Sequence, residues 1–95
     1  MALIDDVKTA LRVDGTANDT EIGNLISACG IDLTIAGVDP DIISTGTDKM
    51  YAFAVTTFCK ANFGADEKDR AAYQESYDKI KIQMVISSTY RRDDA

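Results

Sequence analysis

Residues 50–63, MYAFAVTTFCKANF, decide the fold, because their apolar and small side chains surround a helix on every side. Lys60 is the only charged residue among them. At about 100° per residue, the stretch has almost no polar face. A helix that is apolar all round has to be buried by other elements, and this one is shorter than the roughly 20 residues that cross a bilayer. We therefore predict a central buried helix over about residues 50–63.

Three further helices are predicted around this central one. The spacing of apolar residues indicates helices over about residues 2–12, 19–36 and 67–85. Gly37 fits a left-handed cap at the end of the second of these, the Asp-Pro-Asp sequence at 39–41 breaks the chain, and residues 42–43 are expected to form a single turn. We predict an all-α fold, a bundle of about four helices in one domain over residues 1–86, followed by a flexible C-terminal tail over residues 87–95.

Gly30 stands in the middle of the second predicted helix, where glycine costs about 1 kcal/mol relative to alanine. Two interpretations account for it. Either the helix tolerates a weak position, or another helix approaches so closely that a side chain would not fit.

Charge is unevenly distributed along the chain, whose formal net charge is −6. Residues 1–47 hold eight acidic and two basic groups, whereas residues 48–95 hold eight of each. The chain has no cluster of Lys and Arg of the kind that displaces counterions from phosphate groups. The absence of such a cluster argues against a role in reading DNA sequence. The acidic net charge fits either ordinary solubility or an acidic surface that DNA slides past.

The residue types that usually carry catalysis or bind metals are missing or scattered. The chain has no histidine, and its glycines form no phosphate-binding loop. Neither Cys29 nor Cys59 has a charged neighbourhood able to lower its pKa, and the two have no C-x-x-C spacing, so we interpret them as core side chains in a reducing compartment. A disulfide between them would require neighbouring helices. We expect no catalytic, cofactor-binding or metal-binding residues and no enzyme activity. The N-terminus has no signal-peptide pattern, so we expect a cytoplasmic protein away from membranes.

Two predicted helices carry more apolar surface than one buried stripe requires. Ile31 and Ile35 lie about 180–220° from the main stripe of their helix, and Ile82, Val85 and Ile86 are displaced by about 120–220° from theirs. Exposed apolar patches of this kind usually mark contacts with another chain, so these residues are candidate interface residues. Two alternatives are that the monomer buries them beside the central helix, and that residues 82–86, IQMVI, form a short strand.

Four sequence motifs follow one another along almost the whole chain, and their order and spacing are informative. They are LIDDVKTALRV at the start, TANDTEIGNLISACGIDLTIAGVD, TDKMYAFAVTTFCKANFGAD and YQESYDKIKIQMVISSTY at 73–90. Over about residues 2–90 this set resembles the head–tail connector family of long-tailed bacteriophages and related prophages, also called adaptor, head-completion or DNA-packaging proteins. One departure is Lys49 after Asp48, where members often carry proline, and it should affect only the start of the helix.

The resemblance implies an all-α, structural, non-enzymatic subunit. Copies would form a ring at the portal vertex, join the phage head to the tail and extend the DNA channel. Implied partners are other copies, the portal protein and a tail-completion or stopper protein, with DNA passing through without sequence-specific binding and no membrane contact. The implied location is the host cytoplasm during assembly and then the portal vertex, or neck, of the virion.

The C-terminal residues Tyr90, Arg91 and Arg92 are additional candidates for a subunit or portal interface. We expect them to order against a portal or neighbouring subunit, the alternative being a solvated terminus. A different overall function also fits the charge, namely a small acidic regulatory module of the antirepressor or DNA-mimic type. Such a module would be a monomer or dimer that competes with DNA for a basic partner.

Overall fold

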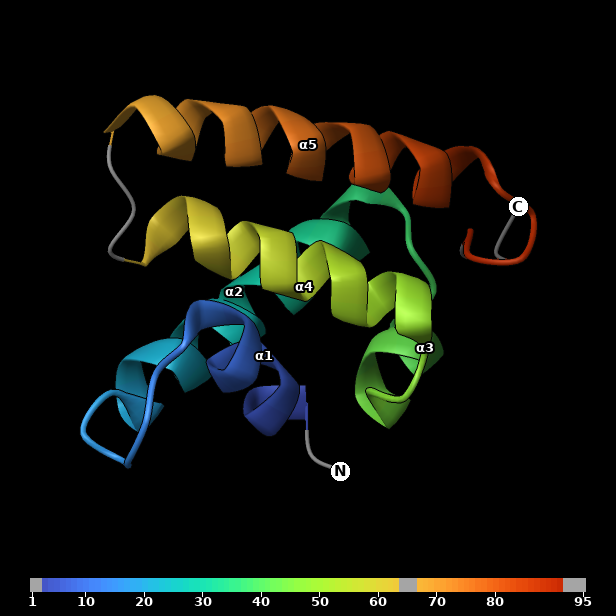
Figure 1. Cartoon of the computed structure of the whole chain (residues 1–95). Coiled ribbons are helices and arrows are strands. Elements are labelled where there is room, and N and C mark those ends of the chain that lie inside the picture. The colour runs from blue at the N-terminus through green and yellow to red at the C-terminus, as the bar shows by residue number, and fades with distance from the viewer. Residues whose placement is uncertain (1–2, 64–66, 92–95) are drawn as a thin grey trace.

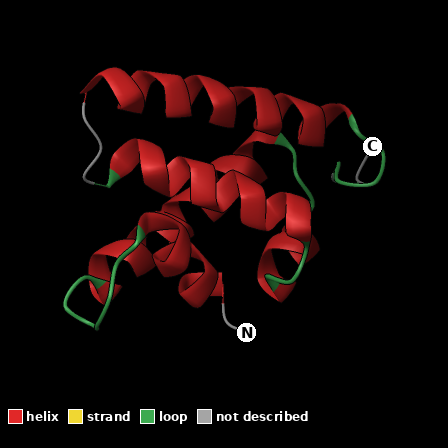
Figure 2. Ribbon diagram, in the orientation of Figure 1, coloured by secondary structure: helices red, strands yellow, loops and turns green. Residues whose placement is uncertain are grey.

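The computed structural model describes residues 3–63 and 67–91, most of which are helical (Figures 1 and 2). The helices are α1 (Leu3–Leu11), α2 (Asp19–Ala36), α3 (Pro40–Thr45), α4 (Lys49–Asn62) and α5 (Glu67–Ile86). The described ranges contain no strand, although one isolated bridge pairs Val38 with Arg91. The predicted all-α bundle is thus confirmed, and the strand alternative for residues 82–86 is wrong, because these residues belong to α5.

The short helix α3 forms where the sequence predicts only a single turn. The Asp39 carboxylate accepts a hydrogen bond from the Asp41 N–H at 2.9 Å, which caps the helix start. Pro40 occupies the first turn, where its fixed φ favours a helix, and Gly46 ends the helix with a φ of 67°. The Asp-Pro-Asp sequence therefore begins a helix as well as ending the preceding connection.

Helix α4 lies at the centre and contacts α1, α2 and α5 (Figure 1). The Asp48 carboxylate accepts a hydrogen bond from the Tyr51 N–H at 2.9 Å and caps the helix, which begins at Lys49 without a proline. Its buried residues are Tyr51, Ala54, Val55, Thr57, Cys59 and Ala61. Phe53, however, is mostly exposed, so one side of the predicted buried helix is uncovered.

The core fills the space between α4 and its neighbours. Fully buried side chains come from α1, α2, α4 and α5, among them Val7, Ile22, Leu33, Tyr77 and Met84. The rings of Phe58 and Tyr77 pack edge to face with centroids 5.0 Å apart. Cys29 and Cys59 are buried free thiols, and burial raises their pKa values to about 12 and about 11. Both cysteines are core side chains, as predicted.

After α5, the chain turns back toward the connection between α2 and α3. The Asp39 N–H donates to the Tyr90 carbonyl at 2.8 Å, and the Tyr90 hydroxyl donates to the Asp48 carboxylate at 3.2 Å. Asp48 therefore caps α4 with one oxygen and binds Tyr90 with the other. Of the predicted flexible tail, Tyr90 makes these contacts and Arg91 pairs with Val38, while residues 92–95 lie outside the described residues.

Replacing Leu33 with alanine tests the assigned core. The Leu33→Ala substitution should lower the free energy of unfolding by about 2–5 kcal/mol, because it leaves a cavity. Ile35→Ala, two residues further along α2, is the matched exposed control, and its effect should stay within about 0.5 kcal/mol. Urea unfolding of dilute, monomeric protein measures both, and equal losses for the two variants would contradict this core.

Candidate interaction surfaces

Large apolar side chains remain exposed on the described part of the chain, each to between 57% and 77%. They are Ile31, Ile35, Phe53, Ile82 and Ile86. The four isoleucines are those whose spacing predicts an extra apolar face, so the alternative that the monomer buries them is wrong. Phe53 is a residue that sequence reasoning missed, because it belongs to the stretch predicted to be buried all round.

The exposed isoleucines lie on two helices, opposite the residues that fill the core. Ile31 and Ile35 are one turn apart on α2, away from the buried Leu33. On α5, Ile82 and Ile86 are also one turn apart. Val85 differs from them, because it is half-buried and its Cγ1 lies 3.8 Å from the position of a Cβ at Gly37. Each helix thus presents an i, i+4 pair of isoleucines to its surroundings.

A groove of about 470 Å³ lies beside the exposed face of α2. It is lined by residues of α2, α3 and α4: Ile26, Ser27, Gly30, Ile31, Thr34, Ile35, Ile43 and Tyr51. A Cβ at Gly30 would lie 3.0 Å from Cγ2 of Ile43 and 3.4 Å from the Tyr51 hydroxyl. The mid-helix glycine is therefore explained by the close approach of α3 and α4. We call this feature the α2–α3 groove.

The Tyr51 hydroxyl lies at the floor of the α2–α3 groove, beside Gly30. The residue is 2% exposed. Burial, and then the nearby thiols of Cys29 and Cys59, raise the pKa of Tyr51 to about 12. The hydroxyl is therefore protonated and neutral near neutral pH.

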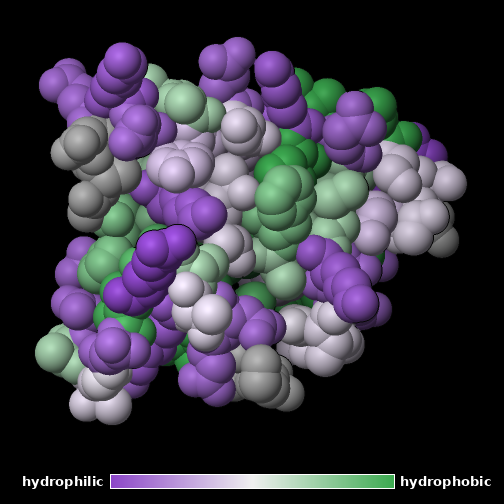
Figure 3. All heavy atoms as spheres, in the orientation of Figure 1, coloured by the Kyte–Doolittle hydropathy of each residue, from purple (hydrophilic) through white to green (hydrophobic). Residues whose placement is uncertain are grey.

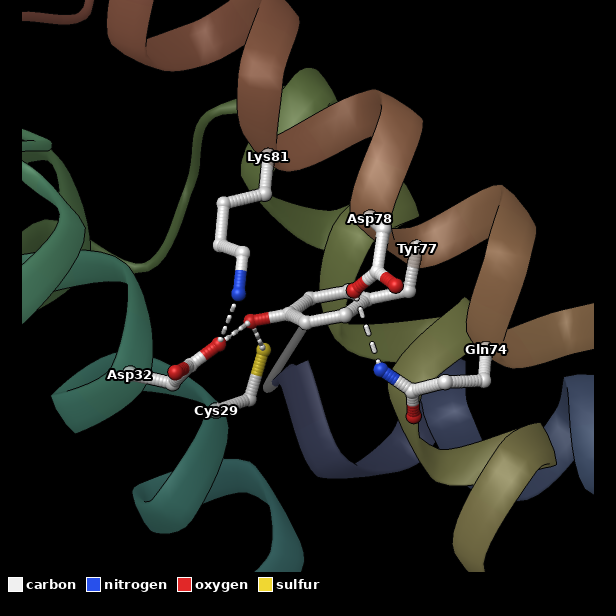
Figure 4. A network of polar contacts seen from close by, with 6 residues as sticks. All are labelled: Cys29, Asp32, Gln74, Tyr77, Asp78 and Lys81. Carbon is white, nitrogen blue, oxygen red and sulfur yellow. Dashed lines mark hydrogen bonds and ion pairs between the residues drawn. The ribbon is translucent and has the colours of Figure 1, made fainter.

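A polar network fastens α5 to α2 near these faces (Figure 4). The Tyr77 hydroxyl and the Lys81 ammonium both donate to one carboxylate oxygen of Asp32, at 2.7 and 3.0 Å. The Cys29 thiol donates to the Tyr77 hydroxyl at 3.7 Å. Burial raises the pKa of Asp32, but hydrogen bonds from Tyr77 and Lys81 outweigh it and hold this pKa below its ordinary value.

The network shows no arrangement suited to catalysis. Tyr77 is buried, and burial followed by its bond to Asp32 raises the pKa of its hydroxyl far above neutral pH. Within the described residues, no group of three His, Cys, Asp or Glu side chains could hold a metal ion. None of the described helices has the length and apolar character needed to cross a membrane. The features that stand out are therefore exposed apolar surfaces.

The C-terminal candidate residues occupy different environments. Tyr90 is half-buried against the bundle through its bonds to Asp39 and Asp48. Arg91 is exposed while its backbone pairs with Val38, and Arg92 lies outside the described residues. The structure thus brings Tyr90 and Arg91 close to the end of α2 but does not join them to the exposed isoleucines.

Comparison with known proteins gives one family. The model of the phage connector protein family matches residues 3–91, nearly the whole chain. No curated protein and no solved structure matches.

Removing the Tyr77 hydroxyl tests the polar network. Tyr77→Phe should lower the free energy of unfolding by about 1–3 kcal/mol, because Asp32 loses a charge-assisted hydrogen bond while the ring still packs. The matched control is Tyr73→Phe, one turn earlier on α5, whose ring lies under Lys60; it should change this free energy by less than about 0.5 kcal/mol. Thermal or urea unfolding measures both. Equal effects would show that the network does not stabilise the pairing of α2 and α5.

Proposed function

Because the chain belongs to the phage connector protein family, we propose that its copies form a ring at the portal vertex of a phage particle. The ring joins the head to the tail and extends the channel through which DNA passes. The observation that carries this proposal is the family match over residues 3–91, which includes every helix the structure describes.

The exposed apolar faces support assembly into a ring. A closed ring joins its copies through two different surfaces, each copy presenting one to either neighbour. The face on α2 that a monomer leaves exposed is suited to such a contact, and the face on α5 is suited to a contact with another copy or with the portal protein. The candidate subunit or portal interface comprises Ile31, Ile35, Ile82, Val85, Ile86, Tyr90, Arg91 and Arg92. Tyr90 holds the C-terminal segment against the bundle and leaves Arg91 accessible to a partner.

The charge of the chain supports a channel that DNA crosses without being held. The net charge is −6 and Lys and Arg are not clustered, so the surface offers little attraction to phosphate groups. We infer a structural role without catalysis, assembly in the host cytoplasm and a final place in the neck of the virion. The partners would be other copies, the portal protein and a tail-completion or stopper protein.

Deleting the gene in its phage or prophage tests this function. We expect heads without tails in electron micrographs, because the portal vertex would lack the platform that the tail binds. Expression of the intact chain should restore tailed particles, and mass spectrometry should find it in purified necks. Normal tailed particles from the deletion strain would contradict the proposal. Competition with DNA for a basic protein would favour the antirepressor or DNA-mimic alternative instead.

Replacing the exposed isoleucines of α5 tests their part in assembly. Ile82→Ser combined with Ile86→Ser should weaken association with a portal ring by about tenfold or more, because burying each isoleucine contributes about 1.5–3 kcal/mol. Gln83→Ser, an exposed polar position on the same helix, is the control and should have little effect. Light scattering with and without the portal ring measures association. If the double variant bound as tightly as the intact chain, α5 would not be an interface.

A further inference from the structure

We propose that Phe53 of one copy inserts into the α2–α3 groove of the next copy. The proposal rests on the connector function above, and it identifies the two surfaces that meet in the ring. The occupant of the groove is thus a second copy of this chain, contributed by the uncovered side of α4.

Phe53 has the features of an interface anchor. Its side chain is 58% exposed and lies between Lys49 and Lys60 on one side of α4. On the face shown in Figure 3, apolar side chains gather over the start of α4 and the end of α5. Aromatic side chains that fill a pocket on the partner carry a large share of the binding energy in many interfaces. Phe53 is therefore placed to dock.

The groove and Phe53 lie on opposite sides of α4. Tyr51, at the groove floor, and Phe53 are two residues apart, which is about 200° around a helix. A ring of many copies needs its two contact surfaces on nearly opposite sides, so that each copy receives one neighbour and inserts into the other. This placement allows one copy to use both surfaces at the same time.

The groove is suited to an aromatic ring in size and in chemistry. Its volume of about 470 Å³ falls in the range of pockets that enclose small organic groups. Ile31, Ile35 and Ile43 provide apolar walls. The Tyr51 hydroxyl borders the groove beside Gly30, and the face of an aromatic ring carries the partial negative charge that can accept a hydrogen bond from a hydroxyl.

Charge also favours α4 as the partner of the groove. Helices α2 and α3 carry acidic residues and no basic ones. Asp19 pairs with Lys8, and Asp32 with Lys81, which leaves Glu21 and Asp41 exposed. In contrast, α4 carries Lys49 and Lys60 and no acidic residue. Opposite charges on two surfaces steer them together and fix their orientation.

Within residues 3–63 and 67–91, another exposed apolar face is the Ile82–Ile86 pair of α5, and it is the rival occupant. Helix α5 carries four acidic and four basic residues, so its charge does not complement α2 and α3. The groove is therefore better matched by α4.

Paired cysteines distinguish the two occupants. Ser27→Cys places a thiol at the exposed rim of the groove, and Thr56→Cys places one beside Phe53, one turn along α4. Gln83→Cys marks the rival face of α5. The native thiols of Cys29 and Cys59 are buried and give little background. Mixing the Ser27→Cys chain with the Thr56→Cys chain under mild oxidation should give about tenfold more disulfide-linked dimer than mixing it with the Gln83→Cys chain, because docking raises the local thiol concentration.

Two further variants test direction and anchoring. A single chain with both Ser27→Cys and Thr56→Cys should form a ladder of oligomers on denaturing gels, because head-to-tail contacts repeat. Adding Phe53→Ala to it should abolish the ladder while urea unfolding stays unchanged, since Phe53 is mostly exposed. A ladder that survives Phe53→Ala, preferential cross-linking to Gln83→Cys, or no enrichment in either mixture would overturn the proposal.

Complementation of the deletion strain distinguishes a wrong contact from a wrong function. If the intact chain occurs in virion necks but Phe53→Ala restores tails to the deletion strain as well as the intact chain does, the contact is wrong and the connector function stands. If the ladder forms and depends on Phe53 but the chain is absent from necks, the contact is supported and the function fails.

Discussion

Covering an apolar helix with a short chain is the constraint on which this structure depends. Helix α4 needs neighbours on several sides, and α1, α2 and α5 provide them. A chain of 95 residues hides only about 60–65% of the surface that its unfolded form exposes. The bundle therefore ends with Phe53 uncovered on α4 and with isoleucines exposed on α2 and α5. The buried core and the exposed apolar surfaces therefore have the same cause: the chain is too short to cover every apolar side chain.

The polar network gives these surfaces a defined relation to each other. Asp32 on α2 accepts hydrogen bonds from Tyr77 and Lys81 on α5, so two helices far apart in sequence are fixed by directional contacts as well as by apolar packing. Apolar contacts alone tolerate sliding more readily than paired charges do. These contacts therefore fix the position of the exposed isoleucines of α2 relative to those of α5.

Helix periodicity predicted the main helices and the four exposed isoleucines, because both follow from local spacing. The same spacing could not reveal Phe53, since it describes how apolar a helix is but not how many neighbours the chain can supply. Helix α3 was recoverable from the capping Asp39 and the following Pro40. The α2–α3 groove depends on Ile43 and Tyr51 meeting at Gly30, and the glycine was the only local sign of it. The contact of Tyr90 with Asp48 left no sign, because it joins residues distant in sequence.

The double use of the Asp48 carboxylate links the end of the described chain to its centre. One oxygen holds the Tyr90 hydroxyl and the other holds the backbone of Tyr51, whose side chain lies at the groove floor. The segment that ends at Arg91 is therefore anchored both at the opening turn of α4 and, through the Asp39 N–H, at the start of α3. The last described turn of the chain and the helix that forms the groove floor thus share one carboxylate.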